Sequence, residues 1–151
     1  MSDFKLPSDL SYNCGLVENP IAYAKERGAA SWLFLIGDEF ASMPGGISYA
    51  DVQKAVPQTA RVISDPPRVL TPELARQQVA ALDALPRPTV ITCRLGPRSS
   101  ATAYLYAGLK LGVSYEEIIA AAEAENAPFC ASDEYKEWVR LSLEVLREGV
   151  V

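Results

Sequence analysis

Short apolar runs alternate with longer amphipathic stretches along this chain. The clearest runs are residues 31–36, 60–63 and 89–92, each with the length and composition of a strand, and a further strand is expected near Leu16 and Val17. Because helical patterns separate consecutive runs, the strands should pair in parallel. The pattern therefore predicts an α/β fold in three layers, with a short, mostly parallel central sheet flanked by helices.

The intervening stretches carry helix-start and helix-stop signals. Ser48 and Thr71 are expected N-caps, Pro72 suits a first helical position, and Gly28 and Gly112 suit the ends of helices. Ser114 and Glu117 have the spacing of a capping box. Helices are thus predicted over residues 20–27, 48–56, from 71 through Leu82, 100–111, from 114 onward and 133–147.

Composition limits the class of protein. A chain of 151 residues, 49% hydrophobic and without repeat or linker, is predicted to form a single domain over 1–151. The net charge of −5 argues against nucleic acid as a partner, and no apolar run is long enough to cross a membrane. The start of the chain lacks the pattern of a secretory signal.

The three cysteines, Cys14, Cys93 and Cys130, are an odd and widely spaced set. Such a set suits a reducing compartment, so a cytoplasmic location is expected. Cys14 and Cys130 are predicted to be buried packing residues, with a role as resolving thiols as the alternative. The chain has no histidine, which excludes Ser-His-Asp triads, Cys-His dyads and His-ligated zinc.

The segment Cys93–Ser99, Cys-Arg-Leu-Gly-Pro-Arg-Ser, carries the strongest chemical signal. It follows the apolar run 89–92 and leads into a helical pattern. The N–H groups at a helix start and in a turn attract anions, and a cysteine thiol in such a field has a lowered pKa. The segment therefore predicts a nucleophilic sulfur in an anion-binding loop, the alternative being a structural turn.

Each residue of the loop has an expected role. Cys93 is the nucleophile, and Arg98 grips two oxygens of the anion as a bidentate fork. Ser99 either donates a hydrogen bond to the sulfur or caps the helix, and Pro97 provides no N–H to the loop. Arg94 is either a second positive charge at the rim or a solvated side chain. The expected anion-binding residues are Arg94, Leu95, Gly96, Ser99 and Ser100.

Residues 62–127 resemble the phosphatase-like domain of β-lactamase-hydrolase-like proteins, which has a tyrosine-phosphatase-like fold. The resemblance is carried by the Cys93–Ser99 loop, matching Cys-Arg-x-Gly-x-Arg-Ser, by Thr71-Pro72 before it, and by the segment 112–118 after it. Gly37-Asp38-Glu39 is similar to an acidic turn of that family. Rhodanese domains share the loop motif alone.

The resemblance implies two chemistries. Tyrosine and dual-specificity phosphatases have a Cys-x(5)-Arg loop, one residue longer than the loop here, whereas rhodanese sulfurtransferases have the shorter length. Family members with the short loop are described as sulfur transferases. The first hypothesis is therefore sulfur transfer through a Cys93 persulfide, from thiosulfate or a persulfide to a thiol acceptor such as glutathione or a protein cysteine.

The alternative hypothesis is a phosphatase acting on a phosphate ester through a phosphocysteine. This chemistry needs a general acid, and Asp65, 28 positions before Cys93, is the best candidate, although Asp65-Pro66-Pro67 is also an ordinary turn. Asp38 and Glu39 are weaker candidates. A third hypothesis is a non-catalytic anion-binding module. The sequence shows no sign of a metal or an organic cofactor.

Overall fold

A four-stranded parallel sheet forms the centre of the fold in this computed structural model, which describes residues 4–37, 47–63 and 70–148. The strands β1 (Leu10–Tyr12), β2 (Ser31–Phe34), β3 (Gln58–Arg61) and β4 (Thr89–Thr92) lie in the order β1-β4-β2-β3. The predicted α/β fold with parallel strands is confirmed.

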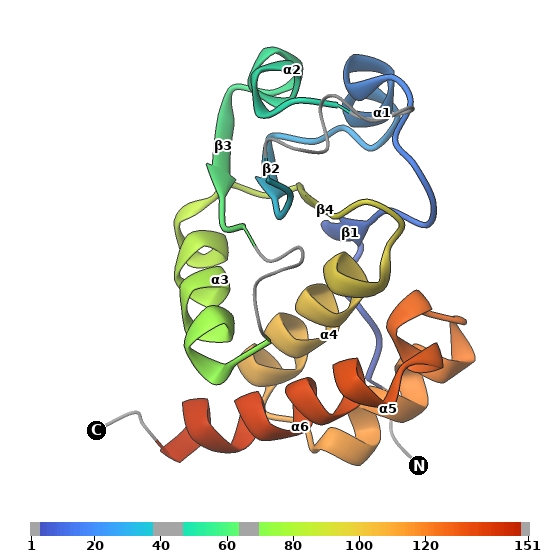
Figure 1. The fold of residues 1–151 in the computed structure, drawn as a ribbon, viewed down its shortest axis with the longest axis vertical. Helices are drawn as coiled ribbons and strands as arrows, with labels where there is room; N and C mark the ends of the chain where they lie inside the picture. Colours follow the sequence, from blue (N-terminus) through green and yellow to red (C-terminus); the bar gives the residue numbers. More distant parts are fainter. Residues whose placement is uncertain (1–3, 38–46, 64–69, 149–151) are drawn as a thin grey trace.

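Helices cover both faces of this sheet (Figure 1). On one side, α1 (Pro20–Glu26) and α2 (Tyr49–Ala55) pack against the sheet through Ala24 and Val52. The larger core lies on the other side. There the covering elements are α3 (Pro72–Ala84), α4 (Pro97–Leu111), α5 (Tyr115–Ala124), a short 3-10 helix η2 (Pro128–Ala131) and α6 (Asp133–Glu148).

The two inner strands divide their side chains between these cores by simple alternation. Trp32 and Phe34 of β2 belong to the α1–α2 core, whereas Leu33 belongs to the larger one. In β4, Val90 faces the first core and Ile91 the second. Successive strand residues point to opposite faces, and both faces are buried, so these strands are continuous apolar runs in the sequence.

Several predicted boundaries are confirmed, among them β4 over residues 89–92 and the side-chain caps of Ser48, Thr71 and Ser114. The predicted strand near Leu16 is wrong. Leu16 is exposed, and the first strand is Leu10–Tyr12, because Leu10 and Tyr12 contact the large core while their backbone pairs with residues 89–91. β3 pairs over residues 58–61, two residues earlier than expected. The 3-10 helix η2 was not predicted.

Helix α4 is the most deeply buried helix of the described chain, with continuous burial from Arg98 to Gly108. Gly108 is where it contacts α5. A Cβ atom added there would lie 2.2 Å from Cδ1 and 2.5 Å from Cγ1 of Ile118, a residue with no exposed surface. The missing side chain is therefore what lets α5 approach α4.

We predict that Gly108→Ala destabilises the protein by up to about 2 kcal/mol. Alanine gains about 1 kcal/mol in helix propensity, but overpacking a closed core costs about 1–3 kcal/mol and should prevail. Urea unfolding of Gly108→Ala, Ile118→Ala and the double variant measures this. Because Ile118→Ala removes both clashing atoms, the double variant should lose less than the sum of the single losses. Strict additivity would contradict the assigned contact.

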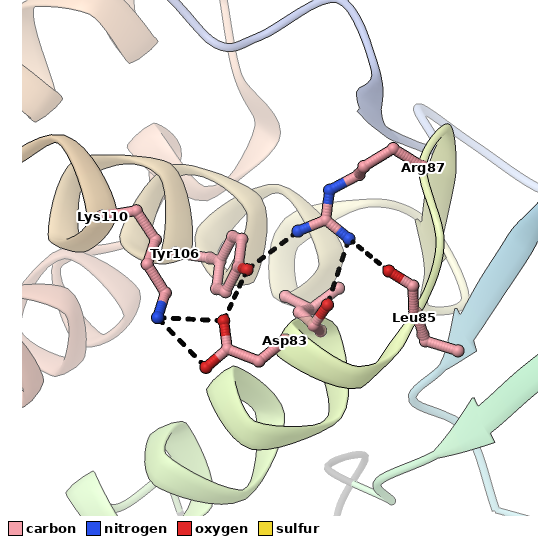
Figure 2. A network of polar contacts seen from close by, with 6 residues as sticks. Asp83, Leu85, Arg87, Tyr106 and Lys110 are labelled. Carbon is pink, nitrogen blue, oxygen red and sulfur yellow. Dashed lines mark hydrogen bonds and ion pairs between the residues drawn. The ribbon is translucent and has the colours of Figure 1, made fainter.

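A polar network fastens α4 to the end of α3 and to the segment that leads into β4 (Figure 2). The Tyr106 hydroxyl donates to Asp83 at 2.8 Å and accepts from Arg87 at 2.8 Å, while Lys110 donates to Asp83 at 3.0 Å. Partial burial alone would raise the pKa of Asp83, but the hydrogen bonds from Lys110 and Tyr106 outweigh it and lower the pKa. The network lies at the amino end of β4.

We predict that Asp83→Asn lowers the unfolding free energy at pH 7 by up to about 1 kcal/mol, the range of exposed ion pairs. A carboxyl whose pKa is lowered by folding stabilises the fold above its ordinary pKa, and this contribution is lost as the pH falls through the lowered value. The difference from wild type should therefore vanish at low pH in urea titrations. Glu18→Gln, at an exposed carboxylate before α1, is the control. A difference that persisted under acid would contradict the role of the Asp83 charge.

Candidate active site

Cys93 follows β4 directly, at the carboxyl edge of the parallel sheet. The chain turns at Gly96, whose φ of 121° lies in the region that favours glycine, and Pro97 then begins α4. A proline suits this first position because its missing N–H would have no partner within the helix. The sequence thus places the sulfur at the amino end of a fifteen-residue helix.

Two backbone N–H groups converge on the Cys93 sulfur. The amide of Gly96 donates to Sγ at 3.1 Å and the amide of Ser99 at 3.3 Å, and the Ser99 hydroxyl oxygen lies 3.5 Å away. Cys93 is 6% exposed, and its side chain also borders the large core. These amides and the α4 dipole favour a negative charge on the sulfur. Of the loop amides, those of residues 96 and 99 thus contact the sulfur itself.

The segment after β1 holds one side of the loop. The Asn13 side chain, which is 1% exposed, donates to the Cys93 carbonyl at 2.9 Å and accepts from the Cys93 amide at 3.1 Å. The Gly15 amide donates to the Leu95 carbonyl at 2.7 Å. Since β1 and β4 are paired and parallel, their carboxyl ends lie together, which places Asn13 against Cys93.

The helix η2 holds the other side. The Ser100 hydroxyl donates to the Pro97 carbonyl at 3.1 Å and accepts from the Phe129 amide, also at 3.1 Å. Phe129 is fully buried and its ring contacts Tyr104 of α4. Ser100, predicted as an anion-binding residue, therefore links the first turn of α4 to η2.

Arg98 lies in the first turn of α4 and is 9% exposed. Its guanidinium carbon is 5.6 Å from the ring centroid of Tyr135 on α6, within the range of a cation–π contact. Burial raises the pKa of Tyr135, opposed by the positive charge of Arg98 and reinforced by the Cys93 sulfur. Tyr135 of α6 thus lies beside the Arg98 guanidinium at the start of α4.

The remaining predicted residues divide into two groups. Arg94 is half-buried, and the side chain of Leu95 is 58% exposed, so Leu95 contributes to the loop through its backbone. The proposed general acid Asp65 and the weaker candidates Asp38 and Glu39 lie outside the described residues.

Three outcomes were not anticipated from the sequence. Cys14, expected to be buried, is exposed, because the turn after β1 directs it outward beside the inward-facing Asn13. Cys130 is half-buried, and burial raises the pKa of its thiol. Asn13 itself was missed. A polar residue directly after a strand, at the sheet edge where the loop lies, is the signal for such a residue, but the apolar pattern predicts the strand near Leu16 instead.

No protein-family model and no curated protein matches the chain. Within the described residues, no helix is both long and apolar enough to span a membrane. Solved structures do match over nearly the whole chain.

Three of these structures show what the fold is similar to. A candidate phosphatase from Neisseria meningitidis has a TM-score of 0.66 and 15% identity, over 94% of this chain and 99% of that one. The core catalytic domain of the S. cerevisiae PP-IP phosphatase SIW14, in complex with citrate, has a TM-score of 0.62 and 14% identity, over 98% and 94%. PTPMT1 in complex with PI(5)P has a TM-score of 0.66 and 13% identity, over 98% of each chain.

Two of these three structures are described as phosphatases, and none of the three as a sulfurtransferase. The narrower resemblance to β-lactamase-hydrolase-like proteins stays a prediction. At these identities the likeness establishes the fold alone, and that fold is tyrosine-phosphatase-like.

Proposed function

We propose that this protein is a cysteine-dependent phosphatase that hydrolyses phosphate monoesters through a phosphocysteine on Cys93. The observation that carries the proposal is the convergence of the Gly96 and Ser99 amides on the Cys93 sulfur, at the amino end of α4. The tyrosine-phosphatase-like fold supports it, since neighbours of this fold include proteins described as phosphatases.

The reaction has two steps. The Cys93 thiolate attacks phosphorus, an S–P bond forms, and the bond to the ester oxygen breaks as that oxygen takes a proton from the Asp65 carboxyl. Water then attacks phosphorus and gives a proton to the Asp65 carboxylate, the S–P bond breaks, and inorganic phosphate leaves with the thiolate restored. Arg98 would hold two phosphoryl oxygens, and the helix N-terminus would stabilise their charge.

We predict that Cys93→Ser lowers the kcat for p-nitrophenyl phosphate by at least about a thousandfold, because the nucleophile is lost. Asp65→Asn should lower kcat by about 10²–10⁴-fold for an alkyl phosphate and by less for p-nitrophenyl phosphate, whose leaving group hardly needs a proton. Cys14→Ser and Cys130→Ser are the matched controls and should retain activity. Full hydrolysis by Cys93→Ser would refute the proposal.

Gly96 provides a test of the loop geometry. A Cβ atom there would lie 2.5 Å from the Asn13 carbonyl oxygen and 3.0 Å from Pro128 Cγ, so the loop must shift. We predict that Gly96→Ala lowers kcat by about 10²-fold, because a displacement near 1 Å at a reacting atom has that effect. Gly112→Ala is the matched control: Gly112 also has a positive φ, 70°, but an added Cβ meets nothing within 4 Å. Equal losses of kcat would mean that backbone strain, and not the loop, is responsible.

Sulfur transfer remains a second candidate because of one observation, the Cys-x(4)-Arg spacing of Cys93 and Arg98. In that reaction the thiolate attacks the outer sulfur of thiosulfate, the S–S bond breaks, and sulfite leaves with the electron pair. A thiol acceptor then removes the sulfur from the persulfide. Intact mass after thiosulfate treatment separates the candidates: a gain of one sulfur atom on Cys93, without phosphate hydrolysis, would replace our proposal. A non-catalytic module would bind phosphate and show neither reaction.

A further inference from the structure

The side-chain amide of Asn13 holds the loop and also determines the direction of a hydrogen bond next to the Cys93 sulfur. Its Nδ2 group donates to the carbonyls of Gly15 at 2.8 Å and Cys93 at 2.9 Å. Its Oδ1 atom lies 3.1 Å from the Cys93 amide nitrogen, which can only donate. These partners fix the orientation of the amide, since a flipped amide would set donor against donor and acceptor against acceptor.

The orientation of Asn13 fixes the direction of the next hydrogen bond. The Ser99 hydroxyl oxygen lies 2.7 Å from Asn13 Oδ1. Because Oδ1 carries no proton, the Ser99 hydroxyl must be the donor, and the Cys93 amide and Ser99 hydroxyl together fill both acceptor sites of Oδ1. Both side chains are buried, so solvent does not replace this bond.

Ser99 has a single hydroxyl proton and three acceptors around it. Asn13 Oδ1 is at 2.7 Å, the Gly96 carbonyl at 3.2 Å and the Cys93 sulfur at 3.5 Å. While the proton lies on the bond to Asn13, Ser99 presents a lone pair to the sulfur and accepts from the Cys93 thiol. That arrangement favours the neutral thiol, and a proton turned toward the sulfur would favour the thiolate.

We infer that Asn13 is a positioning residue that holds the Ser99 hydroxyl proton away from the Cys93 sulfur and so sets how readily the thiolate forms. The inference deepens the proposed function, since it concerns the nucleophile of that reaction. Among the described residues, the other titratable or charged groups around the sulfur include Arg94 and Arg98 of the loop and helix start, Tyr23 of α1 and Tyr135 of α6, while Asp65 lies outside them. Burial raises the pKa of Tyr23 to about 12, so this phenol stays neutral across the pH range of the test.

The test is the pH midpoint of Cys93 alkylation by iodoacetamide, in a Cys14→Ser/Cys130→Ser background so that one thiol reacts. Asn13→Ala removes the nearest acceptor of the Ser99 proton, which can then turn toward the sulfur or toward the Gly96 carbonyl. We expect the midpoint to fall by about one pH unit, a tenfold rise in the thiolate fraction well below the midpoint. In a Ser99→Ala background, Asn13→Ala should leave the midpoint unchanged, because no hydroxyl proton remains to be released.

A purely structural role for Asn13 gives a different result. Removal of its amide would then loosen the loop and shift the alkylation midpoint equally with and without the Ser99 hydroxyl. Such equal shifts would overturn the inference, and so would a higher midpoint in Asn13→Ala. Should Asn13→Ala fail to fold, Ser99→Ala alone decides. We expect that variant to lower the midpoint slightly or leave it unchanged, because a bond accepted from the thiol is lost, whereas a rise of about one unit would show that Ser99 donates to the thiolate.

Alkylation requires no phosphate ester, so this experiment is independent of the proposed reaction. If the alkylation midpoints are as expected but the protein hydrolyses no phosphate ester, the inference about Asn13 stands and the proposed phosphatase function is refuted. If the protein hydrolyses phosphate esters but the effects of Asn13→Ala and Ser99→Ala on the midpoint are independent, the phosphatase function stands and the inference about Asn13 is refuted.

Discussion

The hydrogen bonds from the Gly96 and Ser99 amides to the Cys93 sulfur are the constraint on which the rest of the site depends. They require a chain that leaves a strand, turns within three residues and enters a helix whose first N–H groups point at the cysteine that ends the strand. Only a residue that tolerates a φ of 121° permits the turn at Gly96. The sulfur takes the place that a side-chain cap holds in α1, α2, α3 and α5, since Gly96 provides no capping side chain to α4.

The surroundings keep this arrangement rigid. Asn13 and Gly15 fasten the loop on the β1 side, and Ser100 fastens it to η2. Helix α4 behind the loop is buried along most of its length, and the Asp83–Tyr106 network anchors its far end. A buried helix in a close-packed core cannot shift by small amounts, so its N–H groups stay aimed at the sulfur. Preorganisation of this kind is how a site stabilises charge without rearranging during the reaction.

Sequence patterns were sufficient where a local signal and the tertiary structure agree. β4 and the caps at Ser48, Thr71 and Ser114 were predicted because apolar composition and side-chain capping act over a few residues. β1 was misplaced because its three residues are defined by pairing with β4 and not by their own composition. Asn13 was missed for the same reason. Its role comes from contacts with a segment 80 positions away, which no local pattern contains.

The short Cys-x(4)-Arg spacing does not conflict with a phosphatase-like scaffold in this structure. The sulfur is held by the amide six positions after Cys93, and that residue is Ser99 rather than the arginine. Because the loop is one residue shorter than Cys-x(5)-Arg, the arginine stands one position earlier, at Arg98, where Tyr135 of α6 borders it. The amide that contacts the sulfur keeps its position. The spacing thus puts the Arg98 guanidinium beside Tyr135, one position before the residue whose amide contacts the sulfur. Under the proposed function, Arg98 and Tyr135 would meet the anion together, and the same Cys93 nucleophile would serve phosphoryl or sulfane sulfur alike.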